Sequence, residues 1–236
     1  MANLVLGYGK LGKEIVQQTG WDYISRTKDN FDFCKLESFE HYLRPFDQIL
    51  NCIAFTQTYS EDREANWNTN YQAVANLCDY CRGTDKKIIH ISSDFVYKGS
   101  KSKAKEEDLP IPCETWYGLT KLLADSYIQI RNNNYLIIRT SFKDRPFPWN
   151  YAIQQQGNFL YTDEISNLII QLVEKKAQGI FNVGRKESWS MYDMAKQTNK
   201  DVGVLSINPN ILMPDDITMD VSKMTNYLRK DNKFYV

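Results

Sequence analysis

The chain has 236 residues, of which 42% are hydrophobic and 25% charged, and its 29 basic side chains balance 29 acidic ones. This length suits one large domain, or one domain with a small lobe. The charge balance gives no signal for nucleic acid, and no apolar run approaches the ~20 residues that a membrane helix needs. We therefore expect a globular protein that binds neither nucleic acid nor membrane.

Short apolar runs alternate with helical patterns through the first two thirds of the chain. The runs that predict strands are 3–6, 21–25, 48–54, 87–92 and 135–140, and helices are predicted near 11–18, 63–81 and 116–131. This alternation predicts the α/β class, with a Rossmann-type, doubly wound parallel sheet between two layers of helices. Ligands of such sheets bind beyond the carboxyl ends of the strands.

The last third of the chain has a different pattern. An aromatic, proline-containing connector at 145–149 precedes a helix start at 162, a short strand at 179–184 and a capping box at 190–193. We expect residues 1–140 to form an NAD(P)-binding Rossmann domain. Residues 141–236 are expected to form a small substrate-binding lobe that is interleaved with it.

A glycine-rich turn, GYGKLG at 7–12, follows the first predicted strand and precedes the first predicted helix. In that context G-x-G-x-x-G places backbone N–H groups and a helix N-terminus against a pyrophosphate. The alternative is a turn that only reverses the chain. The candidate cofactor contacts in this turn are Gly7, Gly9, Lys10, Leu11 and Gly12.

The end of the second predicted strand bears on the choice of nicotinamide cofactor. NAD enzymes usually carry an acid there, which binds the ribose 2′-hydroxyl. This chain has Arg26 instead, whose guanidinium can bind a 2′-phosphate. We therefore expect NADPH, with NADH still open. Asp32 and Phe33 are candidate contacts for the adenine.

Tyr117 and Lys121 lie four residues apart on a predicted helix, which places them on one face. An ammonium there favours the phenolate and lowers the tyrosine pKa, as proton transfer near neutral pH requires. The spacing alone is common on solvated helices. Ser93 ends the strand before it, where its hydroxyl can bind a carbonyl oxygen; Ser92 competes, and strand alternation should turn one of the two away. Together with the glycine turn, these residues predict a nicotinamide-dependent enzyme that moves a hydride.

The five cysteines form no disulfide framework, and Cys78 and Cys81 fall on the apolar face of a predicted helix. We interpret these two as buried thiols. With two histidines and no second C-x-x-C, we expect no metal site. A reducing cytoplasm is the expected compartment, because the chain also starts without a charged leader and apolar h-region.

Several runs in the same order resemble the extended short-chain dehydrogenase/reductase family, and within it the dTDP-4-dehydrorhamnose reductases. The resemblance covers nearly the whole chain. The runs are NCIAFT at 51–56, SSDFVYKG at 92–99, YGLTK at 117–121, IRTS at 138–141, YTDE at 161–164, GIFN at 179–182 and DVSK at 220–223.

The resemblance implies a reduction of the C4 carbonyl of a nucleotide-linked 4-keto-6-deoxysugar in deoxysugar biosynthesis. It implies Tyr117 as general acid, Lys121 as the group that lowers its pKa and binds the nicotinamide ribose, and Ser93 as the carbonyl-orienting hydroxyl. Asn70 would complete a proton relay, unless it is only a solvent-facing polar residue. Further residues implied are Ile53 and Ala54 beneath the nicotinamide, and Thr56, Thr58 and Thr140 as sugar or cofactor contacts.

The chain also departs from the pattern of that family. Its turn lacks one residue of the usual G-x-x-G-x-x-G, and the segment 142–159, usually longer, is short. Two alternatives remain at this stage: a nucleotide-sugar epimerase, and a non-catalytic dinucleotide-binding regulatory subunit. Phe95 replaces the glutamate base of related dehydratases. The expected partner is a nucleotide-sugar, and a homodimer is an open possibility.

Overall fold

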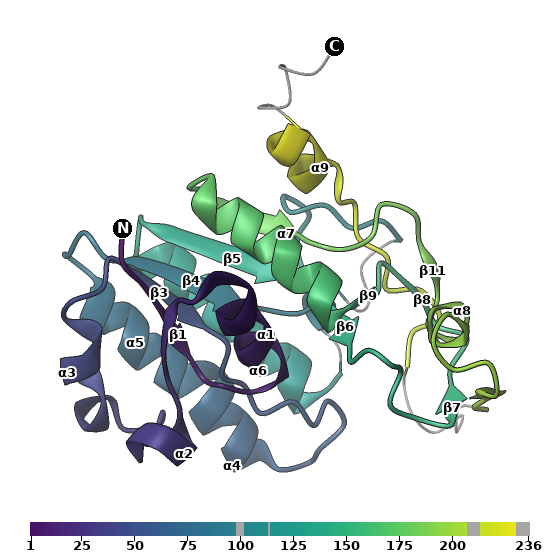
Figure 1. Cartoon of the computed structure of the whole chain (residues 1–236), viewed down its shortest axis with the longest axis horizontal. Helices are drawn as coiled ribbons and strands as arrows, with labels where there is room; N and C mark the ends of the chain where they lie inside the picture. The colour runs from purple at the N-terminus through teal and green to yellow at the C-terminus, as the bar shows by residue number, and fades with distance from the viewer. Residues whose placement is uncertain (98–101, 113, 207–212, 230–236) are drawn as a thin grey trace.

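A parallel sheet of six strands forms the centre of the molecule (Figure 1). The computed structural model describes residues 1–97, 102–112, 114–206 and 213–229, so the last two residues of the 92–99 motif lie outside it. The strand order is β10-β5-β4-β3-β1-β2. The strands are β1 (Asn3–Leu6), β2 (Asp22–Ile24), β3 (Gln48–Asn51), β4 (Lys87–Ile91), β5 (Tyr135–Arg139) and β10 (Gly179–Asn182). This confirms the predicted Rossmann-type architecture.

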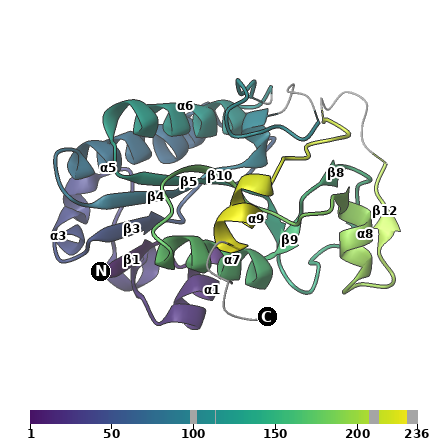
Figure 2. The ribbon, with the colours of Figure 1, turned by 90° about the horizontal axis from the view of Figure 1, so that it is seen from above.

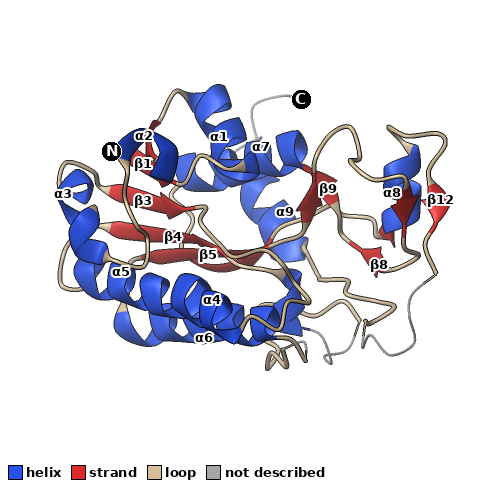
Figure 3. Ribbon diagram, turned by 90° about the horizontal axis from the view of Figure 1, so that it is seen from below, coloured by secondary structure: helices blue, strands red, loops and turns tan. Residues whose placement is uncertain are grey.

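Helices cover both faces of this sheet, as Figures 2 and 3 show from opposite sides. One layer is α1 (Lys10–Thr19) with α7 (Thr162–Glu174); the other contains α5 (Ala73–Cys81) and α6 (Trp116–Arg131). Alternate residues of β1 divide between the two layers: Leu4 and Leu6 pack in one hydrophobic cluster and Val5 in the other. The period-two apolar pattern of a strand buried on both faces therefore builds two cores.

The predicted helix at 63–81 is continuous but not uniform. It begins as α4 (Arg63–Asn66), passes through the π-helical segment η2 (Trp67–Gln72) and ends as α5. Cys78 and Cys81 are buried free thiols on α5, as interpreted from the sequence. Wider π-helical turns often occur at functional sites, and this one carries Asn70.

Four of the five strands predicted in the first two thirds are shorter than the sequence indicated: β2 loses one residue at each end, β5 loses its last residue, and β3 and β4 also end early. The run 48–54 is a strand only as far as Asn51, and the run 87–92 only as far as Ile91. The residues beyond these points leave the sheet ladder at its carboxyl edge. The short elements α2 (Arg26–Asp29), η1 (Leu36–Ser38) and α3 (Glu40–Leu43) were not predicted, because a single turn has too few residues for a periodic pattern.

The C-terminal third contributes to both parts of the molecule. Strand β10 joins β5 at the sheet edge, and α7 packs beside α1 on one face of the sheet. The remaining segments form a smaller body at the carboxyl edge (Figure 3), whose core includes Phe147, Phe159, Tyr161 and Met194. Its elements are β6 (Phe142–Lys143), β7 (Tyr151–Ala152), β8 (Gln156–Gly157), β9 (Leu160–Tyr161), β11 (Trp189–Ser190), α8 (Met191–Lys196) and β12 (Gly203–Val204), and α9 (Ser222–Arg229) follows near β10. None of the helices in the described residues is long and apolar enough to cross a membrane.

Candidate active site

A cavity of about 510 Å³ opens at the carboxyl edge of the sheet, between the sheet and the smaller body. Its walls come from the glycine-rich turn, the ends of β3, β4 and β5, the start of α6 and the connector after β6. The lining residues predicted from the sequence are Gly9, Lys10, Leu11, Ala54, Thr56, Thr58, Ser93, Tyr117, Lys121 and Thr140. The structure therefore gathers side chains from distant parts of the chain into one space.

The glycine turn is shaped by close backbone contacts. Gly7 has φ +93°, and a Cβ there would lie 2.6 Å from Ile53 Cγ1. At Gly12 a Cβ would lie 2.0 Å from the Gly7 carbonyl oxygen, so both positions exclude a side chain. Gly9 faces open space and precedes α1 without a side-chain cap. The first turn of α1 is thus available to an anion in the cavity.

Helix α6 holds Tyr117 and Lys121 at the cavity. Thr115 caps the helix by accepting the Gly118 N–H at 3.1 Å, so the helix begins just before Tyr117. The Lys121 side chain is 1% exposed, and its Nζ donates to the Ile91 carbonyl at 2.6 Å. Burial lowers the pKa of the Lys121 ammonium to about 8, although the charges of Asp125 and Cys52 act in the opposite direction.

Both serines after β4 belong to the residues that surround the cavity, and the expectation that one of their side chains turns away stays a prediction. Strand β4 ends at Ile91, so strict alternation no longer applies beyond it. The Ser93 Oγ donates to Asp94 Oδ1 at 2.9 Å and accepts the Phe95 N–H at 3.2 Å. The Ser92 and Thr140 hydroxyls are buried and have no hydrogen-bond partner among the described residues. Buried hydroxyls without a partner are uncommon in native structures, and these two belong to residues beside the cavity.

Charged groups surround the end of the cavity near Ser93. Asp94 is 3% exposed, and burial raises the pKa of its carboxyl to about 6 even though the Ser93 hydrogen bond and the nearby Lys143 lower it. Burial lowers the pKa of Lys143, opposed by the charge of Asp94. Lys10 of the glycine turn forms an ion pair with Asp144. Two cationic side chains and two carboxylates therefore line this end of the cavity.

Asn70 is buried rather than solvent-facing, and it does not line the cavity. Its Oδ1 accepts the Phe55 N–H at 2.8 Å, and its Nδ2 donates to the Phe55 carbonyl at 3.1 Å. A second donation goes to Asn66 Oδ1 at 3.2 Å. The amide thereby fixes the backbone that leads from Ala54 to Thr56, both of which line the cavity.

The other predicted cofactor residues lie outside the cavity lining. Arg26 is exposed at the first position of α2. Asp32 accepts the Cys34 N–H at 3.0 Å, whereas Phe33 is 5% exposed and packs in the core near Phe39. Ile53 is half-buried, and its neighbour Cys52 is the residue that reaches the cavity. No group of three potential metal ligands occurs within the part of the chain that is described.

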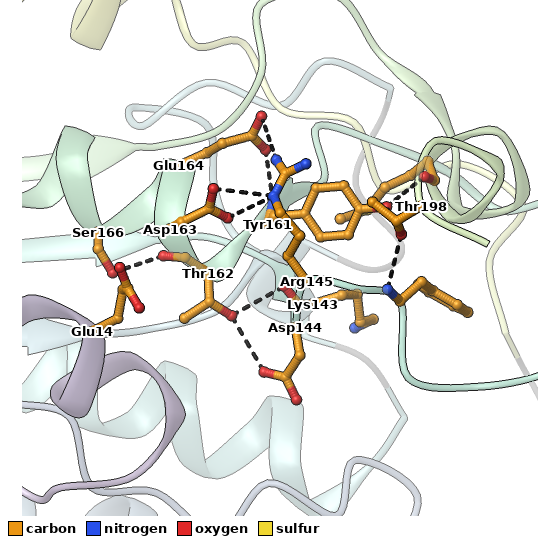
Figure 4. Close-up of polar contacts among 12 residues, drawn as sticks. Glu14, Lys143, Asp144, Arg145, Tyr161, Thr162, Asp163, Glu164, Ser166 and Thr198 are labelled. Carbon is orange, nitrogen blue, oxygen red and sulfur yellow. Dashed lines mark hydrogen bonds and ion pairs between the residues drawn. The ribbon is translucent and has the colours of Figure 1, made fainter.

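The connector after β6 supplies the wall opposite the sheet. Figure 4 shows how it is held: Arg145 donates to both Asp163 carboxylate oxygens at 3.0 Å and pairs with Glu164 at 2.9 Å. The Arg145 guanidinium also lies 4.0 Å from the centroid of the Tyr161 ring. These contacts tie the connector to the start of α7.

Nine further residues of the cavity lining were not named as candidates from the sequence: Cys52, Ile91, Asp94, Phe95, Ser141, Phe142, Lys143, Asp144 and Trp149. The Phe95 ring lies edge-on to Tyr117, with centroids 6.0 Å apart. Lys143 and Asp144 follow β5 closely, so their position after a strand end was the available signal. No sequence signal indicated Trp149, because its position depends on the path of the connector.

Comparison with known proteins agrees with this geometry. The family described as the RmlD substrate binding domain matches residues 1–143. The spore coat polysaccharide biosynthesis protein SpsK of Bacillus subtilis is 24% identical, covering 83% of this chain and 77% of its own length. The dTDP-4-dehydrorhamnose reductase of Mycolicibacterium smegmatis is 22% identical, covering 83% of this chain and 67% of its own length.

A solved structure has the same fold. The dTDP-4-dehydrorhamnose reductase of Bacillus anthracis, determined in complex with NADP, superposes with a TM-score of 0.82 at 18% identity. The match covers 100% of this chain and 94% of that one. At this identity the similarity establishes the fold.

Proposed function

Because this chain belongs to the family described as the RmlD substrate binding domain, we propose that it is an oxidoreductase that uses NADPH to reduce the C4 carbonyl of a nucleotide-linked 4-keto-6-deoxysugar. The observation that carries this proposal is the single cavity that joins the glycine turn to Ser93, Tyr117 and Lys121. A dinucleotide site and an acid–base pair in one space are what a hydride transfer to a carbonyl requires.

The residues present fit a dinucleotide. The uncapped start of α1 at Gly9 would bind the pyrophosphate, and Lys10 would add a positive charge beside it. Ser92 and Thr140, whose buried hydroxyls have no partner among the described residues, lie beside the same cavity. When bound, NADPH supplies the hydride. Arg26 at the start of α2 is the proposed partner of the 2′-phosphate, and NADH remains usable.

Tyr117 is the proposed general acid, which gives its phenolic proton to the C4 oxygen. Lys121 stabilises the resulting phenolate, since its ammonium lies on the same helix face one turn away. Ser93 orients the carbonyl by donating its hydroxyl hydrogen to the substrate oxygen. To do so, the hydroxyl must give up its hydrogen bond to the Asp94 carboxylate. Asn70 acts through the Phe55 backbone that it fixes.

The substrate side of the cavity is formed by Thr56, Thr58 and the connector residues. Trp149 is 51% exposed at this wall, so its ring is available to a sugar or a nucleobase. The charge of Lys143 acts on Asp94, and its ammonium at the cavity can bind a phosphate of the nucleotide. The four described cysteines that carry free thiols support a reducing compartment, and the proposed site of action is the cytoplasm.

The test is the loss of NADPH absorbance when the protein meets a panel of nucleotide-linked 4-keto-6-deoxysugars, with NADH run in parallel. Tyr117→Phe should lower turnover at least about a hundredfold, because the general acid is lost, while NADPH binding persists. Tyr151→Phe is the matched control, since Tyr151 is 60% exposed and lies outside the cavity lining.

Other outcomes would identify the alternatives. Interconversion of sugar epimers without net NADPH loss would indicate an epimerase. NADPH binding without turnover of any sugar, together with binding to a partner enzyme, would indicate a regulatory subunit. Unchanged turnover in Tyr117→Phe would refute the proposed role of Tyr117. Sedimentation of the purified protein would show whether it forms a homodimer.

A further inference from the structure

His90 is a buried ionisable residue in β4 that the proposed mechanism does not use. Its side chain is 0% exposed and lies between two polar groups. Its Nε2 is 3.1 Å from Lys121 Nζ, and its Nδ1 is 3.4 Å from Asn51 Nδ2. A neutral imidazole has one N–H and one lone pair, so its two contacts must be of opposite kinds.

The orientation of Asn51 determines what the Nδ1 side of the ring can do. The Asn51 Oδ1 accepts the Ile53 N–H at 3.0 Å, which leaves the amide nitrogen facing His90. An amide NH₂ group only donates. The Nδ1 atom of His90 is therefore satisfied only as an acceptor, which places the ring hydrogen on Nε2.

Lys121 faces that hydrogen. An ammonium has three donors and no lone pair, and one of its donors goes to the Ile91 carbonyl at 2.6 Å. With the ring hydrogen on Nε2, an ammonium would oppose donor to donor across 3.1 Å. A neutral Lys121 amine, in contrast, accepts the Nε2–H. The row Asn51–His90–Lys121 thus contains one donor too many while Lys121 is protonated.

We propose that His90 is a positioning residue of the active site, which exchanges one neutral tautomer for the other when Lys121 loses its proton. Beside the ammonium, Nε2 accepts from Lys121 and the hydrogen lies on Nδ1. Beside the amine, Nε2–H donates to Lys121 and Nδ1 accepts from Asn51. Each state holds one ring hydrogen, so the pair releases a single proton, to water in the cavity that Lys121 lines.

The amine state satisfies one more buried hydrogen bond than the ammonium state, which favours proton loss from Lys121. Burial and the adjacent Lys121 charge lower the pKa of His90 well below its ordinary range, which agrees with a ring that stays neutral. The other ionisable groups around the pair are Cys52 after β3, Tyr117 and Asp125 on α6, and Arg139 on β5, whose guanidinium is bound by Asp125.

This inference concerns the Lys121 to which the proposed function assigns a role, but its test does not depend on turnover. The sequence has two histidines, and His41 is exposed. In ¹⁵N-histidine-labelled protein, long-range ¹H–¹⁵N spectra distinguish the two tautomers and the imidazolium, and His41→Gln assigns the signals. Across roughly pH 6 to pH 10, we expect His90 to change from the Nδ1–H to the Nε2–H tautomer with a midpoint at about 8.

Two results would overturn the proposal: one tautomer at every pH, or an imidazolium forming near pH ~6.5 as in an ordinary histidine. In Lys121→Met the contact with Asn51 alone determines the tautomer of His90. The Nε2–H tautomer should therefore persist over the whole pH range. The wild-type titration tests the idea even if that variant does not fold.

A kinetic experiment connects the tautomer to the reaction. In His90→Gln the side-chain carbonyl gives the ammonium a permanent acceptor, so the basic limb of the kcat/KM profile should move to higher pH by about one unit. A loss of kcat with the limb unmoved would indicate a merely structural role and count against the proposal. A wild-type protein inert toward every ketosugar would refute the proposed function and leave the spectroscopic result standing.

Discussion

At the scale of single residues, the Asp94 carboxyl is the acid of the cavity with the most unfavourable environment. It is 3% exposed, and burial raises its pKa to about 6. Because the folded pKa lies above the unfolded value of 3.8, the folded chain binds this proton more tightly. The favourable contribution of the protonated carboxyl is complete below about pH 4 and is lost as the pH rises through about 6.

Asp94→Asn should therefore stabilise the protein at neutral pH. The raised pKa corresponds to at most about 3 kcal/mol, reduced because the uncharged amide no longer compensates Lys143. Denaturant unfolding at about pH 7.5 and pH 4 measures this, and the difference from wild type should vanish at the lower pH. The exposed Asp22→Asn controls for the loss of one charge. An Asp94→Asn protein that is less stable at both pH values would contradict this reading of the site.

At the scale of elements, α6 is the helix that connects local sequence signals to the site. The Thr115 hydroxyl accepts the Gly118 N–H at 3.1 Å, and Tyr117 is the second residue of the helix. The predicted bounds 116–131 are confirmed, because the signals that set them are local: the capping residue directly precedes the segment and the apolar stripe lies within it. The same cap fixes the backbone that carries Tyr117.

Removing this cap should affect stability and activity together. Thr115→Ala is expected to cost about 1 kcal/mol of unfolding free energy. It should also lower kcat, since a frayed first turn no longer holds Tyr117 at the cavity. Thr115→Ser keeps the hydroxyl and should restore both quantities. Thermal unfolding measures the stability and NADPH oxidation measures kcat. A Thr115→Ala variant that is less stable but has a normal kcat would show that the cap does not position Tyr117.

At the scale of the whole molecule, two sets of contacts attach the connector wall to the rest of the protein. The ion pairs of Arg145 are partly exposed, with side chains 39% to 45% accessible. The Tyr161 hydroxyl is buried, donating to the Met194 carbonyl at 2.7 Å and bonding Thr198 at 2.8 Å. The Thr198 hydroxyl in turn accepts the Phe147 N–H of the connector at 2.9 Å. Exposed ion pairs contribute little, whereas buried groups left without partners are costly.

Tyr161→Phe should therefore destabilise the protein more than Arg145→Ala. We expect about 1–3 kcal/mol for the loss of the buried hydroxyl and less than about 1 kcal/mol for the loss of the exposed ion pairs. Chemical denaturation of the two variants side by side measures the order. The reverse order would mean that the cation stacked on the Tyr161 ring, rather than the hydroxyl beneath it, attaches the wall.

Much of the site follows from local sequence because its residues lie at strand ends and helix starts. The glycine turn, Ser93, Tyr117 and Lys121 were all named from short patterns, and the structure places them at one cavity apart from Gly7 and Gly12, which shape the turn. Their roles in binding and catalysis stay predictions until the variants are measured. The end of β4 was predicted one residue too late, because the apolar run continues past the last residue of the ladder.

The sequence by itself determined the order of strands and helices and the edge of the sheet at which the site lies, since apolar period and turn chemistry are properties of neighbouring residues. Only the tertiary structure decided that Lys143, Asp144 and Trp149 close the cavity, and that His90 lies between Asn51 and Lys121. Those contacts join residues far apart in the chain. Their geometry depends on how two layers of side chains pack, which no local pattern encodes.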